Sequence, residues 1–315
     1  MAEMNQNIQA AAKRALAEGR AEVVLGYRQG SAPLTAAPHF AETPEDCAHF
    51  VNTSFARVNL AVFLPKYPRK VALIARGCEA RSAVGQVIES QFPRENLYVI
   101  GVGCQGMVDP EAVLAREKRL IREVSEDLAA INLSGDGWNA SLPKAEVLRR
   151  NCQTCICRTP KDLADEIIGP DEAPFPADDF ADLKALAAKP PQEKLAHYKN
   201  LIKDCLRCYA CRQACPLCYC PICFVDETRP QWLGKSNDEM DTFIFHILRG
   251  FHCAGRCTSC GACEAACPLD IKLREFNRIL EEEVQKEWQF VPGLSWDQKP
   301  PLTTYRPDDE AEFIR

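Results

Sequence analysis

The stretch from Cys205 to Phe224, CLRCYACRQACPLCYCPICF, holds seven cysteines in twenty residues. Its first four cysteines follow the spacing C-x2-C-x2-C-x3-C, and proline comes directly after them. The same spacing, again closed by proline, returns in the segment 257–268. This repeat is the only internal one in the chain, and it indicates that the C-terminal half is a paired sulfur-ligand module.

In the spacing typical of two-cluster iron–sulfur proteins, three cysteines of a run hold one cluster and the fourth holds the other. The first 4Fe–4S cluster is therefore predicted on Cys205, Cys208, Cys211 and Cys267. The second is predicted on Cys257, Cys260, Cys263 and Cys215. Structural zinc, which uses paired C-x2-C knuckles, is the alternative. Two complete runs, each closed by Cys-Pro, favour the clusters.

The bulk composition bounds the class of protein. The chain has 315 residues, 38 Lys plus Arg against 44 Asp plus Glu, and a net charge of −6. A mildly acidic chain without a basic block is no candidate for nucleic-acid binding. Residues 1–20 read as an amphipathic helix without the apolar core of a secretory signal, and the longest apolar runs are too short to cross a membrane. We expect a cytoplasmic protein without direct membrane insertion. Twelve of its 18 cysteines lie between Cys205 and Cys267, and this clustering indicates metal binding.

Residues 70–131 alternate between strand and helix patterns. KVALIA is a buried strand, a helix with an apolar stripe follows Cys78, and NLYVIGV is a second strand that ends before Cys104. Asp109 and Pro110 predict the start of a further helix over 110–131. The order predicts a parallel βαβ unit. Because the carboxyl ends of parallel strands meet at one edge, Cys78 and Cys104 are expected to face one site if the strands are neighbours.

A C-x2-C pair downstream extends this site. Cys152 and Cys155 supply two more thiols, so that four ligands for a third 4Fe–4S cluster are at hand, and Cys157 can replace one of them. The alternative is that Cys78 and Cys104 are small buried apolar side chains. Thiols at two successive strand ends favour the cluster.

The remaining cysteines leave two interpretations open. Cys218, Cys220, Cys223 and Cys253 can form a fourth cluster or a small metal site, or they can pack around the other clusters. Cys47 stands alone and is interpreted as a structural thiol. Among the histidines, His246 is expected in the core and His252 can hydrogen-bond a cluster sulfur.

A family resemblance rests on three motifs. GCEARSAVGQVIESQ, then YVIGVGCQGMVD with Gly103 where a proline is usual, then NCQTCIC resemble the beta subunits of deazaflavin-dependent hydrogenases and dehydrogenases, certain formate dehydrogenases among them. The resemblance covers roughly residues 65–170. The C-terminal half looks like the dicluster modules that accompany heterodisulfide reductase-like and formate dehydrogenase-like complexes of anaerobes.

The resemblance implies cofactors and site residues. Members bind iron–sulfur clusters and, in the deazaflavin-reducing branch, FAD. Carried over by position, Cys104 and the pair Cys152 and Cys155 match cluster ligands, while Arg81 and Ser82 fall where a cofactor or partner can be contacted. The ferredoxin-like module is C-terminal here, whereas deazaflavin-reducing members carry it at the N-terminus.

The expected fold is an α/β domain with a short parallel βαβ unit plus an α-helical dicluster ferredoxin-like domain. We expect the α/β domain at 1–170, a linker at 171–195, the cluster domain at 196–290 and an extended tail at 291–315. The expected function is electron transfer between a catalytic dehydrogenase or hydrogenase subunit and a heterodisulfide reductase-like flavin and iron–sulfur subunit. The alternative is a flavin-containing subunit that itself exchanges electrons with a soluble carrier.

Overall fold

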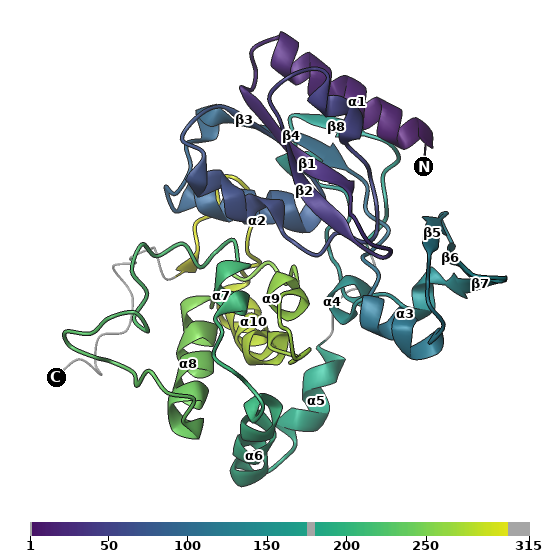
Figure 1. Cartoon of the computed structure of the whole chain (residues 1–315). Coiled ribbons are helices and arrows are strands. Elements are labelled where there is room, and N and C mark those ends of the chain that lie inside the picture. Colours follow the sequence, from purple (N-terminus) through teal and green to yellow (C-terminus); the bar gives the residue numbers. More distant parts are fainter. Residues whose placement is uncertain (1, 175–179, 302–315) are drawn as a thin grey trace.

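The computed structural model describes residues 2–174 and 180–301, and its first half is an α/β layer structure (Figure 1). A five-stranded mixed sheet has the order β2-β1-β3-β4-β8. β2 is antiparallel to β1, and every other neighbouring pair is parallel. The strands are β1 Val23–Gln29, β2 Ala36–Ala41, β3 Val71–Ala75, β4 Leu97–Val102 and β8 Glu166–Ile168.

Helices cover both faces of this sheet, α1 Ala2–Ala17 on one and α2 Gly77–Ile88 on the other (Figure 1). Every residue of β3 is buried, as expected for a parallel strand between two layers. Alternate residues divide between the two cores: Leu73 packs toward α2, whereas Ala72 and Ile74 pack toward α1. The prediction that β3, α2 and β4 form a parallel βαβ unit is confirmed.

The predicted helix over 110–131 is wrong beyond its first turns. α3 spans Pro110–Arg116, capped by the Asp109 carboxylate as expected, and an antiparallel sheet follows. Its strands are β5 Glu123–Glu126, β6 Ala130–Gly135 and β7 Trp138–Pro143. The sequence signal is Asp136-Gly137, a tight hairpin turn in which Gly137 has a φ of 77°. Ile131 and Leu133, on the same face of β6, are buried in a small core that is separate from those of the five-stranded sheet.

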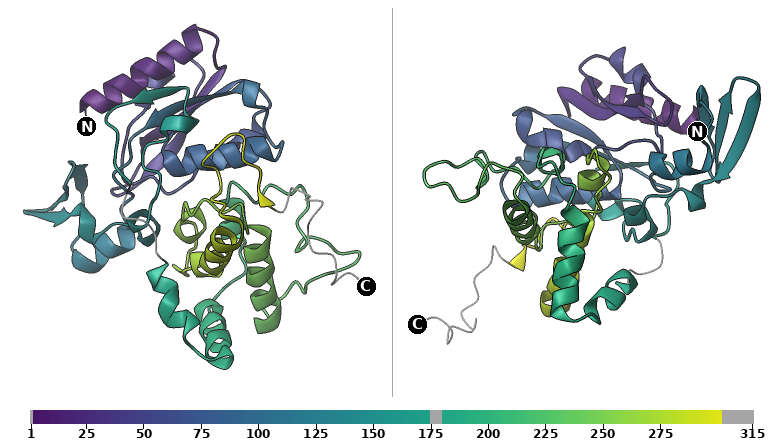
Figure 2. Two further views of the ribbon diagram at one scale, coloured as in Figure 1. Left: turned by 180° about the vertical axis from the view of Figure 1, so that it is seen from behind. Right: turned by 60° about the horizontal axis from the view of Figure 1, so that its bottom comes forward.

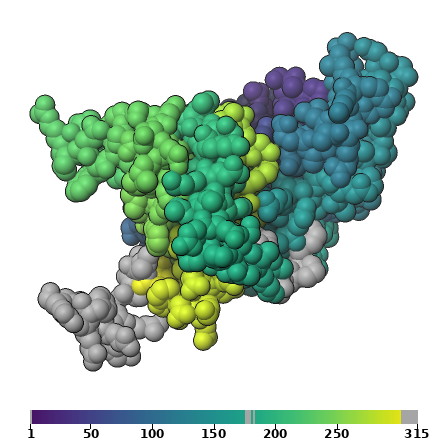
Figure 3. Space-filling view, turned by 90° about the horizontal axis from the view of Figure 1, so that it is seen from below, coloured from purple at the N-terminus to yellow at the C-terminus, as the bar shows by residue number. Residues whose placement is uncertain are grey.

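The C-terminal half is helical and packs below α2 (Figure 2). Seen from below, its green and yellow segments occupy one side of the molecule and the blue 110–143 region the other (Figure 3). The apolar patterns of 239–251 and 271–288 predict helices, and these are present as α8 Glu239–His252 and α10 Arg274–Trp288. The other helices from Arg150 onward are α4 Arg150–Gln153, which comes before β8, and then α5 Ala181–Ala187, α6 Pro191–Ile202, α7 Ala210–Gln213 and α9 Ala262–Ala265. Short 3₁₀ turns occupy Asp46–His49, Leu60–Lys66, Arg94–Asn96, Lys144–Glu146 and Lys161–Leu163.

The remaining predicted segments are described in part. The expected linker at 171–195 contains α5 and the first turn of α6. Of the expected tail at 291–315, residues 302–315 lie outside the described residues. No helix in the described ranges has the length and apolar character needed to cross a membrane.

Candidate metal centres

The two cysteine runs adopt the same local structure. In each run the residues two and four positions after the first cysteine have positive φ: Arg207 (49°) and Tyr209 (60°), then Ser259 (53°) and Gly261 (70°). A one-turn helix follows, α7 or α9. These left-handed positions curl the backbone around the first thiol, so that the Arg207 N–H donates to the Cys205 sulfur (3.4 Å). Backbone N–H groups turned inward in this way stabilise negative charge.

The fourth cysteine of each run lies beside the opposite run. Burial raises the pKa of the Cys205 thiol, and the neighbouring thiols of Cys267 and Cys208 raise it further. Burial likewise raises the pKa of Cys260, and Cys215 is the next cause. Cys267 therefore lies near the first run and Cys215 near the second. This arrangement is expected if each cluster takes three cysteines from one run and the fourth from the other.

His246 contacts the first run directly. The imidazole is 2% exposed, and its Nε2 lies 3.3 Å from the Cys205 sulfur. Burial lowers the pKa of His246 to about 3, so the ring is neutral near pH 7 and can donate only one N–H. The expected core position is correct, but the sulfur contact was foreseen for His252. That side chain is exposed and packs edge-on against Phe224 instead.

Arg249 lies between the two runs. It projects from α8, is 4% exposed, and donates from Nη2 to the carbonyl oxygen of Cys211 (3.3 Å). Its Nε has no hydrogen-bond partner among the described residues. The thiols that act on it are, in order of effect, those of Cys263, Cys253, Cys215 and Cys211, and together they raise its pKa although burial alone would lower it.

The three extra cysteines of the opening stretch are separated from one another. Cys218 joins Cys253 and Cys215 in a group whose sulfurs all lie within 4.8 Å of one another. Among the described residues this is the one group of three or more such ligands found at that spacing. Cys220 is exposed and Cys223 is half-buried; neither belongs to the group. The structure thus brings together two of the four expected ligands of a fourth site, with Cys215 beside them.

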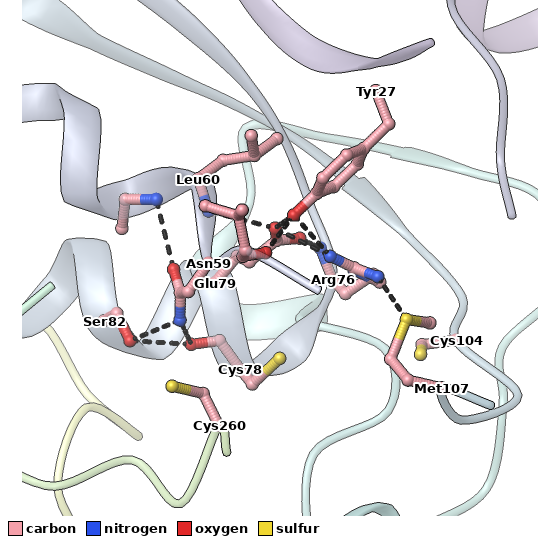
Figure 4. Close-up of polar contacts among 12 residues, drawn as sticks. Tyr27, Asn59, Leu60, Arg76, Cys78, Glu79, Ser82, Cys104, Met107 and Cys260 are labelled. Atoms are coloured by element: carbon pink, nitrogen blue, oxygen red, sulfur yellow. Dashed lines mark hydrogen bonds and ion pairs between the residues drawn. The ribbon is translucent and has the colours of Figure 1, made fainter. Parts of the chain in front are cut away.

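A second sulfur-rich site is a cavity of about 180 Å³ where the two halves of the chain meet. The three segments that predict a third cluster all reach it. Its lining includes Cys78, Cys104, Cys152, Cys155 and Cys157. Cys257 and Cys260 of the second run line the same cavity, and Cys260 is an electrostatic neighbour of Cys78 (Figure 4).

Strand ends and turns position these thiols. Cys78 stands in the first turn of α2, directly after β3, and Cys104 follows β4. The Cys104 sulfur accepts from the Gly106 N–H (3.4 Å), and the Cys152 sulfur accepts from the Met107 N–H (3.2 Å). A side chain at Gly77 would collide with the backbone carbonyl of Cys157. Glycine is therefore required there for the Cys157 loop to close over α2.

A buried ionic network of Tyr27, Arg76 and Glu79 lies next to Cys78 of the cavity (Figure 4). Glu79 is fully buried and pairs with Arg76 through Nη2 to Oε1 and Nε to Oε2, both 2.9 Å. The Tyr27 hydroxyl donates to Glu79 (2.7 Å) and accepts from Arg76 (2.8 Å). Burial would raise the pKa of Glu79, but Arg76 outweighs it and lowers that pKa. The Arg76 charge also lowers the pKa of Cys78, although burial dominates that thiol and raises its pKa.

Arg81 and Ser82 lie at the junction of the two halves. Arg81 donates to the carbonyl oxygen of Pro292 from Nη2 (2.7 Å) and Nε (2.9 Å). The Ser82 hydroxyl is 2.8 Å from that of Thr258, in the second cysteine run. Further along α2, Gln86 donates to the carbonyl oxygen of Pro216, which closes the first run (2.6 Å). One side of α2 therefore holds both cysteine runs.

Helix α4 and the residue before it also hold the second run. The Asn151 amide donates to the carbonyl oxygen of Cys260 (3.0 Å), and Arg149 donates to that of Gly261 (3.0 Å). A side chain at Gly261 would meet Asn151 at 2.5 Å, so this close approach needs glycine. Sequence reasoning missed Arg76, Glu79 and Arg249; the signal for the first two is a charged i,i+3 pair at a strand-to-helix turn, and Arg249 stands on a helix otherwise read as apolar.

Comparison with known proteins gives relatives over nearly the whole chain. No protein-family model matches. The beta subunit of the F420-dependent formate dehydrogenase of Methanocaldococcus jannaschii is 23% identical and aligns over 89% of both chains. The beta subunit of F420-dependent formate dehydrogenase 1 of Methanococcus maripaludis is 24% identical over 92% of this chain and 90% of the relative.

A solved structure also aligns, the F420-reducing [NiFe] hydrogenase complex of Methanosarcina barkeri. The aligned region covers 52% of this chain and 65% of that one, with 18% identity and a TM-score of 0.40. The two sequence relatives confirm the resemblance found in the motifs: over about nine tenths of its length the chain is similar to the beta subunits of two F420-dependent formate dehydrogenases.

Proposed function

We propose that this chain is the iron–sulfur electron-transfer subunit of a multi-subunit oxidoreductase. The observation that carries the proposal is the continuity of the sulfur ligands: the cavity lined by Cys78, Cys104, Cys152 and Cys155 also contains Cys260 of the second run. The second run in turn adjoins the first through Cys215. A path for electrons needs such closely spaced centres and no catalytic acid, base or nucleophile.

Three 4Fe–4S clusters fit the donor sets. The first takes Cys205, Cys208, Cys211 and Cys267, the second takes Cys257, Cys260, Cys263 and Cys215, and the third takes Cys78, Cys104, Cys152 and Cys155. The crossed neighbours of Cys267 and Cys215 support the first two sets. The orphaned Nε of buried Arg249 supports an anionic group between the runs, since a buried cation without a counter-charge is costly. Bound clusters would supply one-electron chemistry.

The protein's own residues have three tasks in this scheme. They bury or half-bury the assigned cysteines other than the exposed Cys208, which limits the access of water to the sulfurs. They direct N–H groups at the thiols, as Arg207 does at Cys205 and Met107 at Cys152. They also fix the distance between halves through the α2 contacts to Thr258 and Pro216. Burial, hydrogen bonds to sulfur and nearby charge are the factors that set cluster potentials.

The cavity size favours a compact cluster over a dinucleotide at the third site. Its volume is about 180 Å³, below the range of about 300–1,000 Å³ typical of pockets for organic ligands. A flavin-containing subunit that itself reduces a carrier is the second candidate. It is favoured by the two sequence relatives, which are beta subunits of F420-dependent formate dehydrogenases.

The partners follow from the proposed role. The relatives are beta subunits of formate dehydrogenases, so we propose a catalytic dehydrogenase or hydrogenase subunit as one neighbour. A flavin and iron–sulfur subunit of the heterodisulfide reductase kind is proposed as the other. We also propose two domains, about 1–170 and 196–290, that meet at the α2 junction.

Anaerobic purification followed by iron, acid-labile sulfide and flavin counts tests the proposal. About twelve irons per chain are expected, about eight would contradict the third cluster, and about sixteen would require a fourth. Absence of iron would refute the proposal. Bound flavin with carrier reduction by the isolated chain would favour the second candidate. Cys78→Ala should remove about four irons, whereas Cys47→Ala, at a buried thiol that donates to the Thr43 carbonyl oxygen (3.5 Å), should remove none.

A further inference from the structure

Arg249 differs in its surroundings from Arg76, Arg278 and Arg207, whereas the buried Arg81, Arg149 and Arg274 resemble it in making no ion pair among the described residues. Arg76 and Arg278 each pair with a carboxylate, that of Glu79 (2.9 Å) and that of Glu281 (3.6 Å). Arg207, also buried, has the Asp241 carboxylate at 4.0 Å. None of the ion pairs found within residues 2–174 and 180–301 includes Arg249.

The charge of Arg249 nevertheless has to be balanced. Arg249 is 4% exposed, and within the described part of the chain its guanidinium donates one hydrogen bond, to a neutral carbonyl oxygen, while its Nε has no partner there. Moving an unpaired cation out of water costs several kcal/mol even after relaxation. Thiols are the groups with the largest electrostatic effect on Arg249 in this interior, so we assign the compensating negative charge to them.

Three of the four thiols that act on Arg249 belong to the proposed clusters of the C-terminal half, and Cys253 belongs to neither. Cys211 is assigned to the first cluster, and Cys215 and Cys263 to the second. A 4Fe–4S centre with four thiolates is anionic and becomes more negative when it takes an electron. A fixed positive charge in the same low-dielectric interior therefore stabilises the reduced form more than the oxidised form.

We propose that Arg249 is the shared counter-charge of the two cysteine-run clusters and raises the reduction potential of both. The inference rests on the proposed function, because it requires the clusters. Arg249 is a positioning residue in this role, since it acts on the clusters through space and ligates nothing. Arginine keeps its charge at every physiological pH, so its effect does not titrate.

The test uses the anaerobically purified full chain, with iron counts and redox titrations followed by electron paramagnetic resonance. Arg249→Gln removes the charge and Arg249→Lys retains it. Lys286→Gln, on the exposed end of α10, removes one positive charge at the surface and serves as control. The proposal expects both couples of the 205–267 module to shift to more negative potential in Arg249→Gln. The third cluster, the Lys286→Gln variant and Arg249→Lys should remain close to wild type.

Each outcome decides. Iron-loaded Arg249→Gln with wild-type potentials overturns the inference alone, as does a shift of equal size in Arg249→Lys. If Arg249→Gln does not retain iron, Arg249→Lys is the deciding variant. If Arg249→Lys retains its iron and has wild-type potentials, the positive charge at this position is needed. If Arg249→Lys also loses its iron, Arg249 has a packing role and the inference is overturned. A wild-type chain without iron overturns the proposed function and this inference with it.

Discussion

The buried carboxylate of Glu79 gives the sharpest stability prediction. Its two oxygens accept five hydrogen bonds: from Arg76 N (3.0 Å), Nε (2.9 Å) and Nη2 (2.9 Å), from the Tyr27 hydroxyl (2.7 Å) and from Leu60 N (3.2 Å). Glu79→Gln keeps the shape but replaces one oxygen by NH2. Placed on the Oε2 side, that group faces two Arg76 donors and leaves both unsatisfied.

The expected loss follows from these contacts. Two buried donors without acceptors cost about 1–3 kcal/mol each, and removing one partner of a buried ion pair costs about 3–5 kcal/mol. The two figures describe the same event, so Glu79→Gln should lower the free energy of unfolding of the α/β half by about 3–5 kcal/mol. Tyr27→Phe, which removes one hydroxyl from the network, should cost less.

Urea unfolding of the anaerobic chain, followed by circular dichroism, measures this loss as a lower midpoint at an unchanged slope. Glu166→Gln is the matched control, because Glu166 pairs with an exposed Arg14 and surface pairs contribute little. A Glu79→Gln midpoint no lower than that of Glu166→Gln would refute the reasoning. It would mean that Arg76 finds other acceptors, with the network carrying no net stability.

Three further predictions concern single positions. Gly261→Ala should lower the midpoint of thermal unfolding and loosen the second cysteine run, because φ is 70° there and the new Cβ would meet Asn151 at 2.5 Å; unchanged stability and cluster signals would contradict this. Asp238→Ala should cost about 0.5–2 kcal/mol, since its carboxylate caps α8 at Met240 N and Asp241 N, and an equal loss in exposed Asp297→Ala would contradict the capping role. Cys220→Ala should leave the iron count unchanged, because the thiol is exposed and outside the group of Cys215, Cys218 and Cys253.

Some of these features could be predicted from the sequence alone. The strand–helix–strand order around Cys78 and Cys104 followed from local periodicity, and β3 and β4 do pair in parallel. The antiparallel sheet was not predicted, although Asp136-Gly137 is typical of its hairpin turn. The reason is that Asp109-Pro110 is also a strong helix start and the residues after it are rich in charge. Local signals of this kind compete, and only packing decides between them.

The contacts between the two halves of the chain could not be predicted from the sequence. Arg81 bonds Pro292 and Thr258, partners 211 and 177 residues away. Nothing local marks such a pair, because the polar side of a helix is equally typical of a surface facing water. The regrouping of Cys218 and Cys253 with Cys215 has the same cause: spacing gives the number of thiols in a segment, whereas the path of α8 decides which of them meet.

Helix α2 connects the two halves of the chain through its two opposite sides. Its apolar side is bound to the sheet, and its polar side reaches both cysteine runs. Successive helix residues differ by about 100° in direction. Insertion of a single residue in α2 would therefore rotate every following side chain away from its partner. Either the sheet or the cysteine runs would then lose their contacts, so the length of α2 is far less free to vary than that of a surface loop.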